Sequence, residues 1–206
     1  MATTGLVLLA AGGSTRLGRS KQLLRWNGTS LLRRAAGTAL ASGCHPVVVV
    51  LGAELEAHRA ELEGLPVRTV ENTRWREGMG GSLRLGLEAL REEPGLEAVV
   101  LMVCDQPAVS AAHLEALVRA RQERGLPIAA SGYAGTVGVP ALFDRSLFSE
   151  LEALPASAGA RPLLTKEPGR VAVVPLPGGE LDVDTPEDAE RLLRLIDPPT
   201  GHGAAR

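Results

Sequence analysis

The sequence has 206 residues, a formal net charge of −2 and an aromatic content of 2%. A chain of this length can bury a core without disulfides or structural metals. Nucleic-acid binders usually carry a basic surface, and single-strand binders need aromatic rings for stacking, so the composition favours a small-molecule partner over a nucleic acid. No apolar run reaches the ~18 residues that cross a bilayer, and the amino-terminal segment lacks the basic region of a signal peptide, so we expect a cytoplasmic protein with no membrane partner.

Apolar runs alternate with amphipathic segments over most of the chain. Runs rich in Val and Leu predict strands at 5–10, 46–52, 66–70 and 97–105. Helical spacing predicts helices at 30–43, 53–64, 80–93 and 110–125. Strands with little polar alternation are typical of a parallel sheet buried on both faces, with the helices as crossovers. The pattern therefore predicts an α/β fold, a doubly wound Rossmann-like three-layer structure with a mostly parallel sheet.

The pattern becomes less regular after residue 125. Segments 132–143 and 155–162 contain many turn residues and are predicted to be loops, whereas 171–176 is predicted to be a strand. A last helix is predicted to run to about Ile196, and the residues that suit its N-cap, N1 and N3 positions are Thr185, Pro186 and Asp188. No shift in composition marks a second domain, so we expect one domain over 1–197 and a disordered tail at 198–206.

Cys44 and Cys104 are the only cysteines, and neither belongs to a C-x-x-C pair. In a reducing compartment such cysteines are free thiols rather than a disulfide. We expect both to be small buried side chains, because free cysteine is among the most buried residue types.

Residues 9–24, LAAGGSTRLGRSKQLL, follow the first predicted strand. In doubly wound sheets ligands bind beyond the carboxyl ends of the strands, and small residues let backbone N–H groups approach a ligand closely. Arg16, Arg19 and Lys21 follow at once, so the segment predicts an anion site, with phosphate as the first candidate. It is not a P-loop, because Arg19 stands where that motif needs its Lys, and the chain has no G-x-G-x-x-G. A plain surface turn would explain the glycines but not the cations.

Asp105 ends the apolar strand predicted at 97–105, where a carboxylate needs a compensating charge. A hard cation is the simplest compensation, and Mg²⁺ prefers one or two protein carboxylates together with substrate phosphates. The stretch DVDTPED supplies Asp182 and Asp184, which face one way if it is extended. Each aspartate alone is more often a helix cap or turn former. Together with the cationic loop they predict a metal and phosphate site.

Residues 72–83, NTRWREGMGGSL, form a second segment of small residues and lead into a predicted helix. Close backbone approach at a helix N-terminus suits a nucleobase edge or another anion. The alternative is a plain helix start in which Trp75 and Met79 fill the core.

Five motifs in this order resemble the molybdenum cofactor nucleotidyltransferases, specifically their cytidylyltransferase branch: LAAGGSTRLGRSKQLL, NTRWREGMGGSL, CDQPAV, GVPALF and DVDTPEDAERL. The resemblance covers residues 5–195. It implies a nucleotidyltransferase fold and the transfer of CMP from CTP to the phosphate of molybdopterin carrying molybdenum, with release of pyrophosphate. It also implies Mg²⁺ as the cofactor, with Mn²⁺ as the alternative, and a molybdoenzyme or its maturation factor as the candidate protein partner.

The resemblance further implies roles for individual residues. Those that would hold the triphosphate are Ala11, Gly12, Gly13, Ser14, Arg16 and Lys21. The base and ribose would lie on Gly80, Gly81 and Ser82, and the metal on Asp105 and Asp184, with Asp182 as the alternative second ligand. Arg16, Lys21 and Asp105 would be catalytic. Ala11 and SKQLL match the cytidylyl pattern, whereas the guanylyl branch has LAGG and an acidic residue before the lysine.

Two other functions are compatible with the same residues. One is nucleotidyl transfer to another phosphate acceptor, such as a sugar phosphate, or from GTP. The other is a carrier or insertion module that holds the finished dinucleotide cofactor without catalysis. Lys21 and Asp105 favour an enzyme, because a carrier needs neither a leaving-group cation nor a metal carboxylate.

No histidine is expected to take part in catalysis. A phosphate monoester, whose second pKa is about 6, has no proton to surrender at neutral pH, so a general base is not required. The positions agree with this expectation: His45 precedes a predicted strand, His58 and His113 lie in predicted surface helices, and His202 lies in the predicted tail.

Overall fold

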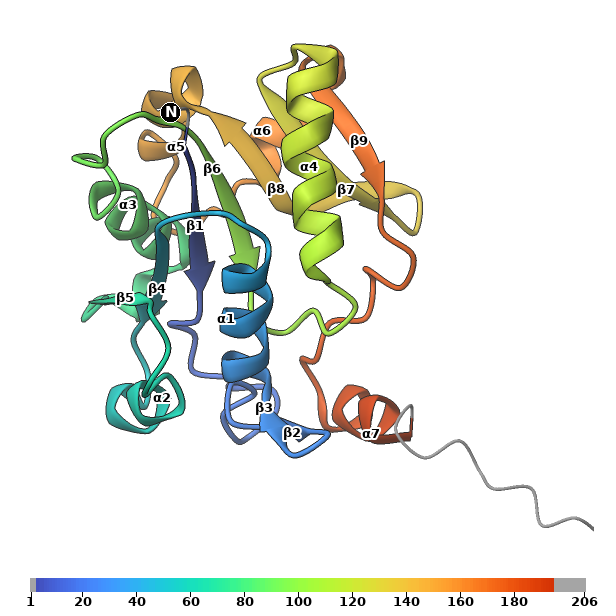
Figure 1. The fold of residues 1–206 in the computed structure, drawn as a ribbon. Helices are drawn as coiled ribbons and strands as arrows, with labels where there is room; N and C mark the ends of the chain where they lie inside the picture. Colours follow the sequence, from blue (N-terminus) through green and yellow to red (C-terminus); the bar gives the residue numbers. More distant parts are fainter. Residues whose placement is uncertain (1–2, 195–206) are drawn as a thin grey trace, which may run out of the picture.

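A seven-stranded sheet forms the middle layer of the protein (Figure 1). The structure is a computed structural model and describes residues 3–194. Strand order is β5-β4-β1-β6-β8-β7-β9, and within this sheet only β8 runs against its neighbours. The strands are β1 Thr3–Leu9, β4 Val47–Leu51, β5 Arg68–Glu71, β6 Leu96–Val103, β7 Ile128–Tyr133, β8 Thr136–Asp144 and β9 Val171–Pro175. The predicted α/β class with a mostly parallel sheet is confirmed.

Helices cover both faces of the sheet (Figure 1). They are α1 Leu31–Ala41, α2 Leu55–Glu61, α3 Met79–Glu88, α4 Ala111–Arg124, α5 Phe148–Glu152, α6 Arg161–Thr165 and α7 Pro186–Arg194. Side chains of β1 alternate between the two sides: Leu6 and Leu8 pack in one core with α1 and α4, and Val7 and Leu9 pack in another with α3, α5 and α6. None of the helices within residues 3–194 has both the length and the apolar character to cross a membrane.

A third apolar cluster holds α7 against the loop that follows β1. Its buried members are Leu17, Leu31, Val183, Ala189 and Leu192. The helix begins with reciprocal hydrogen bonds, because the Thr185 amide donates to Asp188 Oδ2 at 3.0 Å and the Asp188 amide donates to Thr185 Oγ1 at 3.2 Å. These bonds form the predicted N-terminal cap. The predicted helix end at Ile196 and the tail lie outside the described residues, and the extent of the domain stays a prediction.

The segment predicted as a loop at 132–143 is instead the hairpin of β7 and β8, so that prediction is wrong. Tyr133 pairs with Thr136, and the two residues between them, Ala134 and Gly135, have φ of 47° and 73°. A two-residue turn with positive φ at both positions matches the twist of a hairpin. The glycines that looked like loop residues thus include a hairpin tip, and a Cβ at Gly138 would lie 2.1 Å from Tyr133 Oη.

Both cysteines are buried free thiols, as predicted. Burial raises the pKa of the Cys104 thiol to about 12, so this group stays protonated at neutral pH.

Candidate active site

Gln22 organises the loop that leaves β1. Its side chain is 1% exposed, and its Nε2 donates to the carbonyl oxygens of Ala10 at 3.2 Å and Gly12 at 2.7 Å. Its Oε1 accepts from the hydroxyls of Ser14 and Ser20, both at 3.0 Å. Two donors and two acceptor positions of the amide are therefore all in use. Sequence reasoning gave Gln22 no role; the available signal was a polar residue directly before an apolar pair.

The remaining contacts of the loop fix its backbone. Ser14 has φ of 50°, and its hydroxyl accepts a hydrogen bond from the Lys21 amide at 3.0 Å. A Cβ at Gly13 would lie 2.6 Å from the ring of Trp75, so this position requires glycine. Ser14 is one of the residues predicted to hold the triphosphate, and its hydroxyl is used inside the loop, whereas Gly12 and Gly13 line a cavity.

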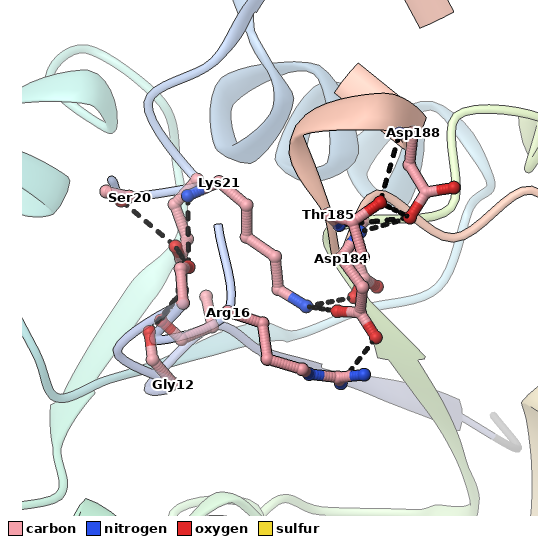
Figure 2. Close-up of polar contacts among 11 residues, drawn as sticks. Gly12, Arg16, Ser20, Lys21, Asp184, Thr185 and Asp188 are labelled. Atoms are coloured by element: carbon pink, nitrogen blue, oxygen red, sulfur yellow. Dashed lines mark hydrogen bonds and ion pairs between the residues drawn. The ribbon is translucent and has the colours of Figure 1, made fainter. Parts of the chain in front are cut away.

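Two carboxylates, those of Asp105 and Asp184, meet Lys21, and Figure 2 shows the contact of Lys21 with Asp184. Asp105 follows β6, and the adjacent β1 leads into the loop that carries Lys21. Lys21 Nζ donates to Asp105 Oδ2 and to Asp184 Oδ1, the latter at 2.8 Å. Arg16 Nη2 donates to Asp184 Oδ2 at 2.7 Å while its side chain stays 72% exposed. Four of the residues singled out in the sequence therefore form one charged cluster.

Lys21 and Asp184 stabilise each other in their charged forms. Burial tends to lower the pKa of Lys21, but the charge of Asp105 and hydrogen bonds to Asp105 and Asp184 outweigh it, so the pKa is raised above its ordinary value. Burial tends to raise the pKa of Asp184, and its contacts with Lys21 and Arg16 lower it overall. Lys21 and Asp184 therefore hold one another ionised at neutral pH.

Asp182 and Asp184 have different surroundings although a single residue separates them. Burial and the nearby charge of Asp105 raise the pKa of Asp182 to about 6. Its side chain lines a separate hollow of about 230 Å³ beside α7. Val183, between them, is 2% exposed and packs in the third cluster. Asp184, and not Asp182, is the carboxylate that shares Lys21 with Asp105.

A cavity of about 470 Å³ opens between the loop and α3. Its walls include Ala11, Lys21 and Asp105 on one side. The opposite side consists of Trp75 and Arg76 in the 3-10 helix Trp75–Glu77, followed by Gly78, Met79 and Ser82. Met79 is 45% exposed, so the alternative in which it fills the core is wrong.

The residues predicted to hold the base have unequal access to this cavity. The Gly80 amide donates to Ala156 O at 2.9 Å, and a Cβ there would lie 2.3 Å from Pro155 O, so this glycine is required by the neighbouring loop. Gly81 has room for a side chain. Ser82 lines the cavity, and its hydroxyl accepts from Asn72 Nδ2 at 2.9 Å.

Among the three histidines within residues 3–194, two are buried, which corrects the prediction that they lie on surface helices. His58 is 0% exposed and its Nε2 lies 2.7 Å from Ser20 Oγ. His113 is 8% exposed and its Nε2 lies 2.7 Å from Ser131 Oγ. Burial lowers the pKa of both imidazoles. The apolar spacing of α2 and α4 gave no sign that a serine elsewhere in the chain would pair with each ring.

The site suits a divalent cation that a substrate helps to hold. Within residues 3–194 no group of three or more His, Cys, Asp or Glu side chains forms a metal site. Mg²⁺, however, needs only one or two protein carboxylates when phosphate oxygens complete its shell. Asp105 and Asp184 both reach the position of one ammonium group, and the buried Asp105 Oδ1 has no hydrogen-bond partner among the described residues. This donor set therefore fits Mg²⁺ or Mn²⁺.

Comparison with known proteins places these features in a family. The model of the MobA-like NTP transferase domain matches residues 6–171. Nicotine blue oxidoreductase of Paenarthrobacter nicotinovorans is 38% identical over 91% of this chain and 95% of its own length. Purine catabolism protein PucB of Bacillus subtilis is 33% identical over 92% and 96%. The crystal structure of Rv0371c from Mycobacterium tuberculosis is 32% identical, has a TM-score of 0.81, and covers 94% of this chain and 98% of that one.

Proposed function

This chain belongs to the family of MobA-like NTP transferases, and on that premise we propose that it transfers CMP from CTP to the phosphate of molybdenum-carrying molybdopterin. The observation that carries the proposal is that the small-residue loop, Lys21 and Asp105 line one cavity, and that Lys21 also binds Asp184. Loop amides and cations suit a triphosphate, and the carboxylate pair suits the divalent cation that accompanies it.

The proposed reaction is an in-line displacement at phosphorus. An oxygen of the acceptor phosphate forms a bond to the α-phosphorus of CTP, and the bond from that phosphorus to the bridging oxygen breaks. Pyrophosphate leaves with the electron pair. Lys21, Arg16 and the loop amides bind the leaving group and stabilise the charge that it gains. Because the acceptor is already an anion at neutral pH, the chain needs to align the two substrates rather than to remove a proton.

Asp105 and Asp184 are the residues proposed to hold the metal. When bound, the cation neutralises charge on the α-phosphate and so lets a second anion approach. A crystal structure of the Mycobacterium tuberculosis relative in complex with manganese supports a divalent metal in this family. In the structure Lys21 bridges the same two carboxylates, and its ammonium group is proposed to transfer to the triphosphate when both substrates bind.

Cytosine selectivity is proposed from Ala11. This residue lines the cavity and is 5% exposed, and its carbonyl accepts from the Ala53 amide at 3.0 Å. A Cβ at Gly52 would lie 2.9 Å from the Ala11 methyl, so the backbone of Gly52 lies close against Ala11. A rigid methyl group at the cavity wall leaves less room for a base than the glycine of the guanylyl pattern.

Pyrophosphate release tests the proposal. We expect release when CTP, Mg²⁺ and molybdenum-carrying molybdopterin are mixed with the protein, and little with GTP or with a sugar phosphate as acceptor. Release with a sugar phosphate but not with molybdopterin would move the protein to another acceptor. Tight binding of the finished dinucleotide without any release would indicate a carrier.

The relative named nicotine blue oxidoreductase makes a redox activity the second candidate, because it is 38% identical to this chain. The same preparation should therefore be assayed for reduction of nicotine blue with a nicotinamide cofactor. The absence of a G-x-G-x-x-G motif from the sequence favours the nucleotidyl transfer. Reduction of the dye without pyrophosphate release would overturn the proposed function.

A further inference from the structure

We propose that His58 is a positioning residue for the loop that binds the nucleotide phosphates, and that it acts through Ser20 and Gln22. The inference rests on the proposed function in one respect, that this loop binds phosphate. His58 lies on α2, and neither it nor Ser20 lines the cavity, so any effect of His58 on a nucleotide must pass through the loop.

The direction of each hydrogen bond follows from Gln22. Its Nε2 faces the carbonyl oxygens of Ala10 and Gly12, which can only accept, so the orientation of the amide is fixed. Its Oε1 then accepts from Ser20, and this contact uses the single hydroxyl proton of Ser20. Ser20 Oγ can therefore only accept from His58, which must carry its proton on Nε2.

This assignment leaves His58 Nδ1 as a bare acceptor, and the structure agrees, because Nδ1 has no partner among the described residues. The ring is 0% exposed, and burial lowers its pKa, so it remains a neutral donor. The ring therefore interacts through one specific hydrogen bond, its donation to Ser20, and not through several polar contacts among the described residues.

The chain of hydrogen bonds reaches the loop both before and after the stretch that contains Arg16 and Arg19. Gln22 binds Gly12 and Ser14 before Arg16, and Ser20 directly precedes Lys21. Loss of the His58 donor leaves Ser20, which is 8% exposed, with an unsatisfied lone pair and weakens the closure of the loop. A looser loop must be ordered again when the triphosphate binds, and this cost reduces affinity.

His113 provides a matched control within the same chain. It also lies on a helix and is buried, and its Nε2 is also 2.7 Å from a buried serine hydroxyl. Ser131, however, donates to Pro140 O at 2.6 Å, so this second chain of bonds ends in the hairpin of β7 and β8. If buried histidines here served only to stabilise the fold, the two positions would respond alike.

The experiment compares His58→Leu, His58→Gln, Ser20→Ala and His113→Leu with the wild type. Hydrogen exchange of amides 10–21 in the nucleotide-free protein measures the order of the loop directly. We expect His58→Leu and Ser20→Ala to speed that exchange and to raise the KM for CTP by ~10-fold, about the worth of one such hydrogen bond, with a smaller change in kcat. The double variant should behave like Ser20→Ala alone, because Ser20→Ala already removes the bond to His58 together with the bond to Gln22. His58→Gln keeps an N–H donor and should restore both values.

His113→Leu should lower the melting temperature yet leave exchange of 10–21 and the KM for CTP unchanged. Equal responses of the loop to His58→Leu and His113→Leu, or no response to either, would overturn the inference. A His58→Leu protein that fails to fold leaves Ser20→Ala to decide, because this change removes only a hydroxyl. The exchange measurement uses no substrate, so absence of pyrophosphate release by the wild type would refute the proposed function while exchange still decides the role of His58.

Discussion

The strand order has two sides, β5-β4-β1-β6 and β8-β7-β9, and they contribute unequally to the charged cluster. Strands β5, β4, β1 and β6 all run in one direction, and Figure 1 shows the arrows of β1 and β6 pointing to the same edge. The cationic loop and Asp105 follow β1 and β6 at that edge. The other side, β8, β7 and β9, contains a hairpin and supplies to the cluster only Asp184, through the segment after β9. Parallel strands gather their following loops in one place, whereas a hairpin turns back and does not.

Lys21→Ala on the parallel side should give the largest effect. This ammonium group is proposed to bind the leaving pyrophosphate, so we expect kcat/KM to fall by on the order of 1,000-fold. Steady-state pyrophosphate release with saturating Mg²⁺ measures it. The matched change on the other side of the sheet is Phe143→Ala, which should lower the free energy of unfolding by ~3–5 kcal/mol and leave the KM for CTP unchanged. Normal turnover by Lys21→Ala would contradict the proposed mechanism.

Asp105→Ala should reduce turnover far more than it reduces folding, by on the order of 100-fold in kcat. Among the described residues Asp105 Oδ1 has no hydrogen-bond partner, and in the variant Lys21 still has Asp184 as a partner, so we expect a smaller loss of stability than of turnover. Asp182 and Asp184 provide a matched pair. Asp184→Asn should raise the Mg²⁺ concentration needed for half-maximal rate, whereas Asp182→Asn should not. The reason is that Asp184, and not Asp182, shares the Lys21 ammonium group with Asp105. A thermally stable Asp105→Ala protein with near-full activity would show that the metal assignment is wrong.

The nucleotide preference tests whether Ala11 on the parallel side sets specificity. Hydrogen-bond discrimination in a pocket can reach several kcal/mol, so we expect CTP to exceed GTP by at least ~10-fold in kcat/KM. Ala11→Gly should narrow that ratio. Equal or faster turnover with GTP in the unchanged protein would place the chain outside the cytidylyl branch.

The same division explains what the sequence could predict. Strands buried on both faces are continuous apolar runs, so β1, β4 and β6 were predictable from composition, and the loops after them followed from the fold class. The hairpin was missed because its glycines resemble those of a loop, whereas Gly138 lies in β8 against the side chain of Tyr133 on β7.

Contacts distant in sequence were the other limit on prediction. His58 and Ser20 are separated by 38 residues and Lys21 and Asp184 by 163, and no local pattern reports such pairs. The choice between Asp182 and Asp184 was open for a similar reason. It depended on where Val183 packs, and that position is set by α7 and the loop after β1.

Stability should decline in mild acid because of the buried histidines. Burial lowers the folded-state pKa of His58 and His113 below the ordinary value of 6.5. Above that pH the two imidazoles are neutral in both the folded and the unfolded chain. As the pH falls below it, the unfolded chain binds protons that the folded chain does not. The free energy of unfolding therefore decreases until the pH passes the folded-state pKa. Each histidine contributes at most about 1.4 kcal/mol per pH unit. Denaturant unfolding between pH 7 and pH 5 measures the free energy of unfolding. We expect it to decline less for His113→Gln than for the wild type, and equal declines would contradict this prediction. His113 is chosen because it lies on the side of the sheet without the predicted phosphate loop.

The smallest effect is expected for conservative replacement of the histidines. A phosphate nucleophile needs no general base, so His45→Gln, His58→Gln, His113→Gln and His202→Gln should each change kcat by less than ~10-fold. The structure alters the reason for two of them, because His58 and His113 are buried rather than on the surface, and we expect glutamine to replace each ring as an N–H donor to the neighbouring serine. His45 is exposed, and His202 lies outside the described residues. The measurement is kcat at saturating CTP and Mg²⁺ with a melting curve for each variant. A folded variant that loses most of its kcat would point to an acceptor that must be deprotonated, such as a hydroxyl. It would also contradict the view that the catalytic groups are only those of the phosphate loop and the two carboxylates.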